Sequence, residues 1–133
     1  MHWIRFDETG FKERVKGEYD RTEDLLVSPE LTEASAVATV RMKKGFETKA
    51  HSHDDMEQIF IVLEGRGELT LRAEKREIEK GALFFIPKGI EHRIVATSDE
   101  LVYIYVSVWP DGKPPGLKPG FHREGRILDL HYE

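Results

Sequence analysis

Residues 45–65 read GFETKAHSHDDMEQIFIVLEG, and residues 81–92 read GALFFIPKGIEH. The first block carries His51 and His53 two positions apart, and the second block ends on His92. Two residues at positions i and i+2 of a strand point to the same face of a sheet. A third imidazole from a neighbouring strand can complete a set of three nitrogen donors around one divalent ion. The spacing therefore predicts a metal site formed by these three histidines.

Short runs rich in β-branched, aromatic and alternating apolar residues surround the two blocks. The runs that we expect to form strands are 25–27, 35–42, 59–63, 68–72, 77–79, 83–86, 92–96, 101–108 and 126–132. Turn signals separate them at intervals of roughly 8–12 residues, and no long stretch has helical periodicity. This pattern is typical of an all-β sandwich or barrel.

The two blocks resemble the paired signature motifs of the cupin superfamily. The positions that match the two motifs at the family's spacings are Gly45, His51, His53 and Gly65, followed by Gly81, Pro87, Gly89 and His92. The resemblance implies an all-β, double-stranded β-helix (jelly-roll) barrel. We expect one cupin domain over residues 1–133, with the barrel at about 34–108, an N-terminal arm at 1–24 and a Pro/Gly-rich C-terminal segment at 109–133.

The resemblance also implies a fourth metal ligand, which is a glutamate in the family's first motif. Counting back six residues from Gly65 gives Gln58, whereas counting forward from His53 permits either Gln58 or Glu57. A slip of one residue turns a side chain to the opposite face of the sheet, so the turn at Gly65 favours Gln58. Glu57 is the alternative ligand. Some cupins that act on sugar acids are similar, with glutamine in this place.

Composition draws further attention to Gln58. It is the only glutamine in a chain that has no asparagine and no cysteine, so any metal here is held by nitrogen and oxygen donors. A neutral amide oxygen leaves the double charge of the ion uncompensated. Such a site should bind anionic oxygen ligands better than a site with three histidines and a carboxylate.

Tyr103 and Tyr105 share one face of the run 101–108 and are the candidate catalytic residues. If that face points into the barrel, a phenol there can act as a general acid or orient a substrate. Alternatively, the valine and isoleucine residues at 102, 104 and 106 fill the core, and the two tyrosines cover a subunit contact. Arg41 is a weaker candidate for contact with an anionic substrate, because we expect it at the surface.

The predicted site and the resemblance together indicate a metal-binding cupin enzyme. Its divalent ion would act as a Lewis acid on a small, oxygen-rich, anionic substrate such as a sugar acid or keto acid, in an isomerase or lyase reaction. The alternatives are a metal-dependent dioxygenase and a non-catalytic metabolite-binding module. The ion is one of Mn, Fe, Co, Ni, Cu and Zn, because imidazole and amide oxygen accept all of them.

Charge and hydropathy exclude other classes of partner. The chain has 20 basic and 25 acidic residues and a net charge of −5, which does not suggest a nucleic-acid binder. Its start lacks the apolar core of a signal peptide, and no apolar run reaches membrane-spanning length, so we expect a cytoplasmic protein without membrane contact. The shortage of thermolabile residues, with 34% charged residues, indicates a thermophile. We expect a homodimer, in which Trp3, Ile4 and Phe6 pack against the partner.

Overall fold

The computed structural model describes residues 21–27, 32–113, 122–123 and 126–127, which form strands and turns. The strands are β1 (Arg21–Val27), β2 (Ser35–Lys43), β3 (Glu57–Glu64), β4 (Arg66–Leu71), β5 (Glu74–Glu79), β6 (Leu83–Ile86), β7 (His92–Ala96), β8 (Glu100–Val108), β9 (His122–Arg123) and β10 (Arg126–Ile127). Within these residues there is no helix that could cross a membrane. The arm residues Trp3, Ile4 and Phe6, and the end of the expected last strand, lie outside the described residues.

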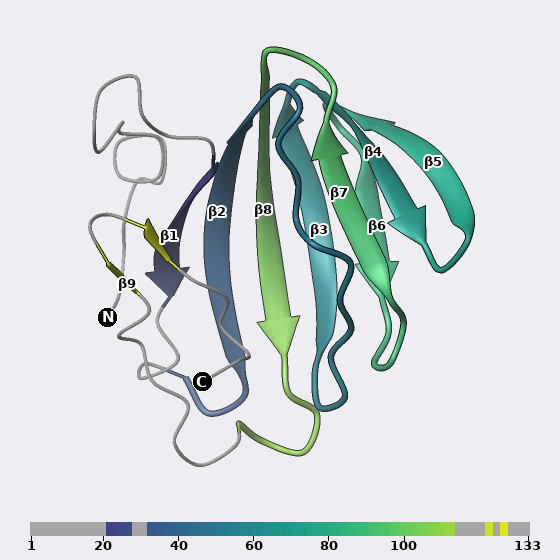
Figure 1. Cartoon of the computed structure of the whole chain (residues 1–133). Helices are drawn as coiled ribbons and strands as arrows, with labels where there is room; N and C mark the ends of the chain where they lie inside the picture. The colour runs from purple at the N-terminus through teal and green to yellow at the C-terminus, as the bar shows by residue number, and fades with distance from the viewer. Residues whose placement is uncertain (1–20, 28–31, 114–121, 124–125, 128–133) are drawn as a thin grey trace.

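The strands form antiparallel sheets whose members alternate along the chain (Figure 1). One sheet has the order β1-β2-β8-β3-β6, a second has the order β5-β4-β7, and β9 pairs with β10. After β3 the chain enters the second sheet for β4 and β5, returns for β6, crosses again for β7 and returns for β8. This alternation between two sheets is the double-stranded β-helix that the sequence predicts.

Most strands agree with the expected runs, but β1 begins at Arg21, inside the expected N-terminal arm, and the turns are tighter than predicted. β4 begins at Arg66 and β5 at Glu74, so residues 66–67 and 74–76, which lie outside the expected runs 68–72 and 77–79, belong to strands. Gly65 and Arg72 make this possible, because both have a positive φ, of 82° and 54° respectively. A left-handed residue reverses the chain within a very short connection.

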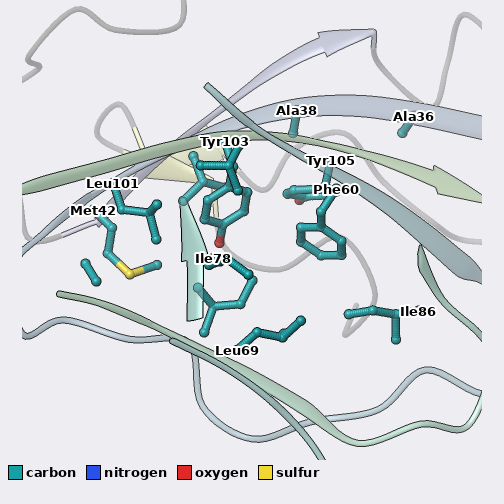
Figure 2. Packing of buried hydrophobic residues seen from close by; sticks show 14 of the residues in the cluster. Ala36, Ala38, Met42, Phe60, Leu69, Ile78, Ile86, Leu101, Tyr103 and Tyr105 are labelled. Atoms are coloured by element: carbon teal, nitrogen blue, oxygen red, sulfur yellow. The ribbon is translucent and has the colours of Figure 1, made fainter. Parts of the chain in front are cut away.

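The core lies between the two sheets and follows the period of two along each strand. On β3 the buried side chains are Gln58, Phe60 and Val62, and on β8 they include Tyr103 and Tyr105. Figure 2 shows Phe60 and Tyr103 from one sheet facing Leu69 and Ile78 from the other. The two tyrosines therefore point into the barrel, and the alternative in which they cover a surface does not hold.

The outer face of the five-stranded sheet is also apolar around β3 and β6. Leu83 and Phe85 of β6 are 65% and 48% exposed, and Ile61 of the adjacent strand is 36% exposed. Phe84 and Ile86 point inward instead. The sequence alone leaves open whether Leu83 or Phe84 lines the interior, and the register of β6 against β3 places Phe84 there.

Gly65 lies at a point of close contact between the β3–β4 turn and the start of β8. A Cβ atom on this residue would come within 1.9 Å of the carbonyl oxygen of Glu100 and 2.7 Å of the hydroxyl of Ser98. Ser98 also accepts a hydrogen bond from the backbone N–H of Arg66, at 2.8 Å. Only glycine fits where the β3–β4 turn meets the start of β8.

Candidate metal centre

The connection between β2 and β3 carries two of the three histidines, and it runs along β7 (Figure 1). His51 forms an isolated antiparallel bridge with His92, in which each backbone N–H donates to the other residue's carbonyl, at 3.1 Å and 2.9 Å. His53 lies outside any strand, and its carbonyl accepts a 2.7 Å hydrogen bond from the N–H of Gly89. The expectation that His51 and His53 lie on one regular strand is therefore wrong.

Further contacts fix this connection against β7. Thr48 exchanges two hydrogen bonds with the backbone of Ile94, because its N–H donates to the Ile94 carbonyl at 2.9 Å and its Oγ1 accepts from the Ile94 N–H at 3.0 Å. The N–H of Gly45 donates to the carbonyl of Ala96 at 2.9 Å. The connection thus extends the sheet beyond β7, and the histidine backbone is held without a regular strand.

The three imidazole rings converge on one point. Their centroids lie 4.9 Å apart for His51 and His53, 4.3 Å for His51 and His92, and 5.3 Å for His53 and His92. One ring nitrogen from each lies within 4.8 Å of the other two, a separation that one metal ion can span. His53 and His92 are buried, whereas His51 is partly exposed. The three histidines could therefore hold a metal ion.

Hydrogen bonds decide which ring nitrogen of His51 and His92 is available to a metal ion. Nδ1 of His92 lies 2.9 Å from the carbonyl oxygen of Ile90, and Nδ1 of His51 lies 2.5 Å from that of Lys49. A carbonyl oxygen can only accept, so in both rings Nδ1 carries the proton and donates. Nε2 then carries the lone pair, which is the arrangement found when a neutral histidine binds a metal.

Gln58 is buried on the inner face of β3, with 5% of its surface exposed, whereas Glu57 is partly exposed on the opposite face. Its Nε2 donates a hydrogen bond of 3.1 Å to Oγ of Ser107. Its Oε1 is buried, and no described residue gives it a hydrogen bond. Leaving a buried carbonyl oxygen unmatched costs roughly 1–3 kcal/mol, so a cation near this atom would relieve a real penalty.

One aromatic ring of β3, that of Phe60, lies beside the histidine cluster. Phe60, two residues after Gln58 on the same face, has its ring centroid 6.3 Å from that of His92. The same ring lies 5.6 Å from the rings of both Tyr103 and Tyr105, and Figure 2 shows Tyr105 beside it. Phe60 is therefore a common neighbour of the two candidate catalytic tyrosines and of His92. Arg41, in contrast, forms a 2.9 Å ion pair with Glu100.

Sequence reasoning missed Ser107 and the pair formed by Glu47 and Arg93. The signal for Ser107 was present, because it is the one aliphatic hydroxyl on the inward face of β8, where the other inward residues are a leucine and two tyrosines. Glu47 and Arg93 gave no signal, because they are 46 positions apart in the chain. Their side chains form a bidentate pair with two hydrogen bonds of 2.7 Å, which joins the histidine connection to β7.

The Glu47–Arg93 pair predicts a dependence of stability on pH. The hydrogen bond from Arg93 lowers the pKa of Glu47 below its ordinary value of 4.5. Because the folded state favours the ionised carboxylate, this stabilisation is complete above about pH 4.5 and is lost as pH falls through the lowered pKa. We expect Glu47→Gln to lower the urea midpoint slightly at neutral pH and to have a smaller effect near pH 3.

The matched control for this measurement is Glu77→Gln. Glu77 is exposed on β5, and the described residues give it no ion-pair partner. With Glu77→Gln, the difference between the urea midpoints at neutral pH and near pH 3 should stay close to that of the wild type. An equal shift for both variants would mean that the Glu47–Arg93 pair does not contribute.

Comparison with known proteins extends these observations. Residues 38–109 match the family model described as "Cupin domain". An uncharacterized protein of Methanocaldococcus jannaschii is 34% identical over 86% of this chain and 95% of its own length. A glucose-6-phosphate isomerase of Pyrococcus abyssi is 31% identical over 51% of this chain, and an acireductone dioxygenase of Schizosaccharomyces pombe is 36% identical over 47%. These matches span only 39% and 36% of the two enzymes.

A solved structure shows the same fold. An uncharacterized conserved protein with a double-stranded β-helix domain from Klebsiella pneumoniae superposes with a TM-score of 0.69, at 15% identity. The superposition covers 85% of this chain and 94% of that one. The alternating sheets, the two glycine-containing blocks and the family match agree with one another, and the chain belongs to the cupin family.

Proposed function

We propose that the protein binds one divalent transition-metal ion through His51, His53, His92 and the amide oxygen of Gln58, and that it is an enzyme. The observation that carries this proposal is the buried Oε1 of Gln58, on the inner face of β3 that also packs against His92. A carbonyl oxygen in that position accepts a cation without burying a negative charge. Glu57 fits less well, because it lies on the other face of the strand.

The donor set determines the kind of substrate that the site favours. Three imidazoles and one amide are all neutral, so they leave the double charge of the ion intact. The bound ion supplies Lewis acidity, which polarises a carbonyl or enolate oxygen. A small chelating anion, such as a sugar acid or keto acid, would gain most from this charge. We therefore favour an isomerase or lyase reaction on such a molecule.

The residues around the histidines support this chemistry. Phe60 and Phe84 are stacked, with ring centroids 4.8 Å apart and planes 7° from parallel, and they give the inner wall an apolar surface. Such a wall limits water and strengthens electrostatic interactions. Tyr103 and Tyr105 flank Phe60, and either phenol could move a proton or orient a bound oxygen.

The substitution Gln58→Glu tests the charge argument. We expect the Co²⁺-loaded variant to bind oxalate and galacturonate about tenfold or more weakly than the loaded wild type, because a carboxylate cancels part of the charge of the ion. Isothermal titration measures both affinities. The loaded wild type should also convert at least one uronate or 2-keto acid, followed by proton NMR. Equal affinities of the wild type and Gln58→Glu would refute the charge argument. If no substrate is converted with Mn, Fe, Co, Ni, Cu or Zn, the proposal that the protein is an enzyme is refuted.

A dioxygenase is the second candidate, because a relative that shares 36% identity over 47% of this chain is an acireductone dioxygenase. The two candidates differ in their need for oxygen. A Lewis-acid reaction proceeds with Zn²⁺ under nitrogen, whereas a dioxygenase needs a redox-active ion and consumes oxygen in proportion to product. Oxygen-electrode measurements on the Fe²⁺-loaded and Zn²⁺-loaded protein decide between them.

A further inference from the structure

The hydrogen bond between Ser107 and Gln58 carries an inference that rests on the proposed metal site and deepens it. We infer that Ser107 is a positioning residue, which sets the orientation of the Gln58 amide so that its oxygen, and not its NH₂ group, faces the histidines. The two ends of an amide are almost equal in shape, but only the oxygen can bind a cation. The Ser107 hydroxyl can donate as well as accept, and in the structure it accepts from Nε2, which leaves the amide oxygen to a cation.

The pairing of the strands puts Ser107 in a position to make this choice. β3 lies between β8 and β6, and Gln58 is directly opposite Ser107 on one side and Ile86 on the other. Residues directly opposite on neighbouring strands have their Cβ atoms about 4.5–5.5 Å apart and on the same face. Ser107 is fully buried, and its Oγ accepts the 3.1 Å hydrogen bond from Nε2 of Gln58.

This hydrogen bond turns the amide oxygen away from β8 and toward β6. The chain that follows β6 contains Gly89, whose N–H donates to the carbonyl of His53 at 2.7 Å, and it then reaches His92. Ile86, on that side of Gln58, is apolar and offers no competing hydrogen bond. Once Nε2 is held by Ser107, Oε1 is directed to the side of β3 where the histidine segments lie.

Without Ser107 the opposite orientation becomes competitive. The NH₂ group could then donate to an imidazole nitrogen in the absence of metal, and the amide would have to rotate before the ion could use its oxygen. The hydroxyl therefore removes a rotation that metal binding would otherwise have to drive. Hydrogen bonds of this kind behind a metal ligand typically change metal affinity by about 10–100-fold.

Cobalt binding tests the role of Ser107 without any assay of activity. We expect Ser107→Ala to weaken Co²⁺ binding by about tenfold or more and to change the visible ligand-field spectrum of the bound ion. Ser107→Thr keeps the hydroxyl and should restore most of the affinity. The matched control is Thr39→Val, which deletes another fully buried hydroxyl, on an outward position of β2. It should leave Co²⁺ affinity and the spectrum unchanged.

A double-mutant cycle separates positioning from packing. If Ser107 acts through the amide, Ser107→Ala should cause no further loss of affinity in a Gln58→Leu background. An equal loss in both backgrounds would overturn the inference, and so would an unchanged affinity of Ser107→Ala in an otherwise metal-binding protein. A wild type that binds no Co²⁺ would instead overturn the proposed metal site, and with it this inference.

Discussion

Replacing His92 by alanine is expected to remove most of the metal that the wild-type protein binds. The ring of His92 lies nearest to that of His51 in the cluster, with centroids 4.3 Å apart, and its Nδ1 is already committed to the carbonyl of Ile90. Loss of a metal-binding nitrogen should lower metal affinity more than loss of a residue that only supports a ligand. We therefore expect the metal affinity to fall by more than about 100-fold. Gln58→Ala should cost less, because three imidazoles remain.

Two measurements check this result. Elemental analysis after dialysis against a limiting metal buffer gives the metal content of wild type, His92→Ala and Gln58→Ala. Thermal unfolding gives an independent measure, because an ion at about 100 times its dissociation constant stabilises the folded state by about 2.7 kcal/mol. The wild type should unfold at a higher temperature when metal is added, and His92→Ala should not. Full metal content in His92→Ala would show that the ion binds elsewhere.

Replacing Gly65 by alanine is expected to destabilise the fold strongly. A Cβ there would lie 1.9 Å from the carbonyl oxygen of Glu100, and this oxygen belongs to the backbone of β8, which cannot shift without disturbing two neighbouring strands. The φ of 82° adds a cost of about 1–2 kcal/mol for any residue other than glycine. With the clash included, we expect a loss of roughly 3–5 kcal/mol.

Gly81→Ala is the control that isolates the steric part of this cost. Gly81 has a similar φ of 91°, but a Cβ atom added to it would meet no heavy atom within 4 Å. It should therefore lose only the backbone cost of about 1–2 kcal/mol. Urea unfolding of both variants measures the difference. If the two losses are equal, the contact with Glu100 is not the reason for glycine at position 65.

Much of the fold follows from local patterns in the sequence. The period of two along 59–63 and 101–108 predicts the strands, and counting from Gly65 predicts that Gln58 rather than Glu57 is buried. The direction of Tyr103 and Tyr105 could not be decided in this way, because the run 101–108 is apolar on both faces. Only the pairing of β8 with β2 and β3 settles which face is inside.

The site was less predictable where it depends on pairs that are distant in the chain. The histidine connection is not among the runs that the sequence predicts to be strands, and its shape is imposed by β7 through His92, Ile94 and Ala96. The Gln58–Ser107 hydrogen bond joins residues 49 positions apart. The local sequence around Gln58 or Ser107 does not indicate this contact, because it forms only when β3 and β8 pair in register.

The alternation of consecutive strands between the two sheets has a consequence for how the protein comes apart. β3 and β6 are neighbours in one sheet, although the whole β4–β5 hairpin of the other sheet separates them along the chain. Neither sheet can form completely before the chain has also placed the strands of the other. Neither sheet can lose its strands while the other stays intact. Unfolding should therefore be a single cooperative event, in which the three imidazoles lose their common centre at the same moment as the sheets separate.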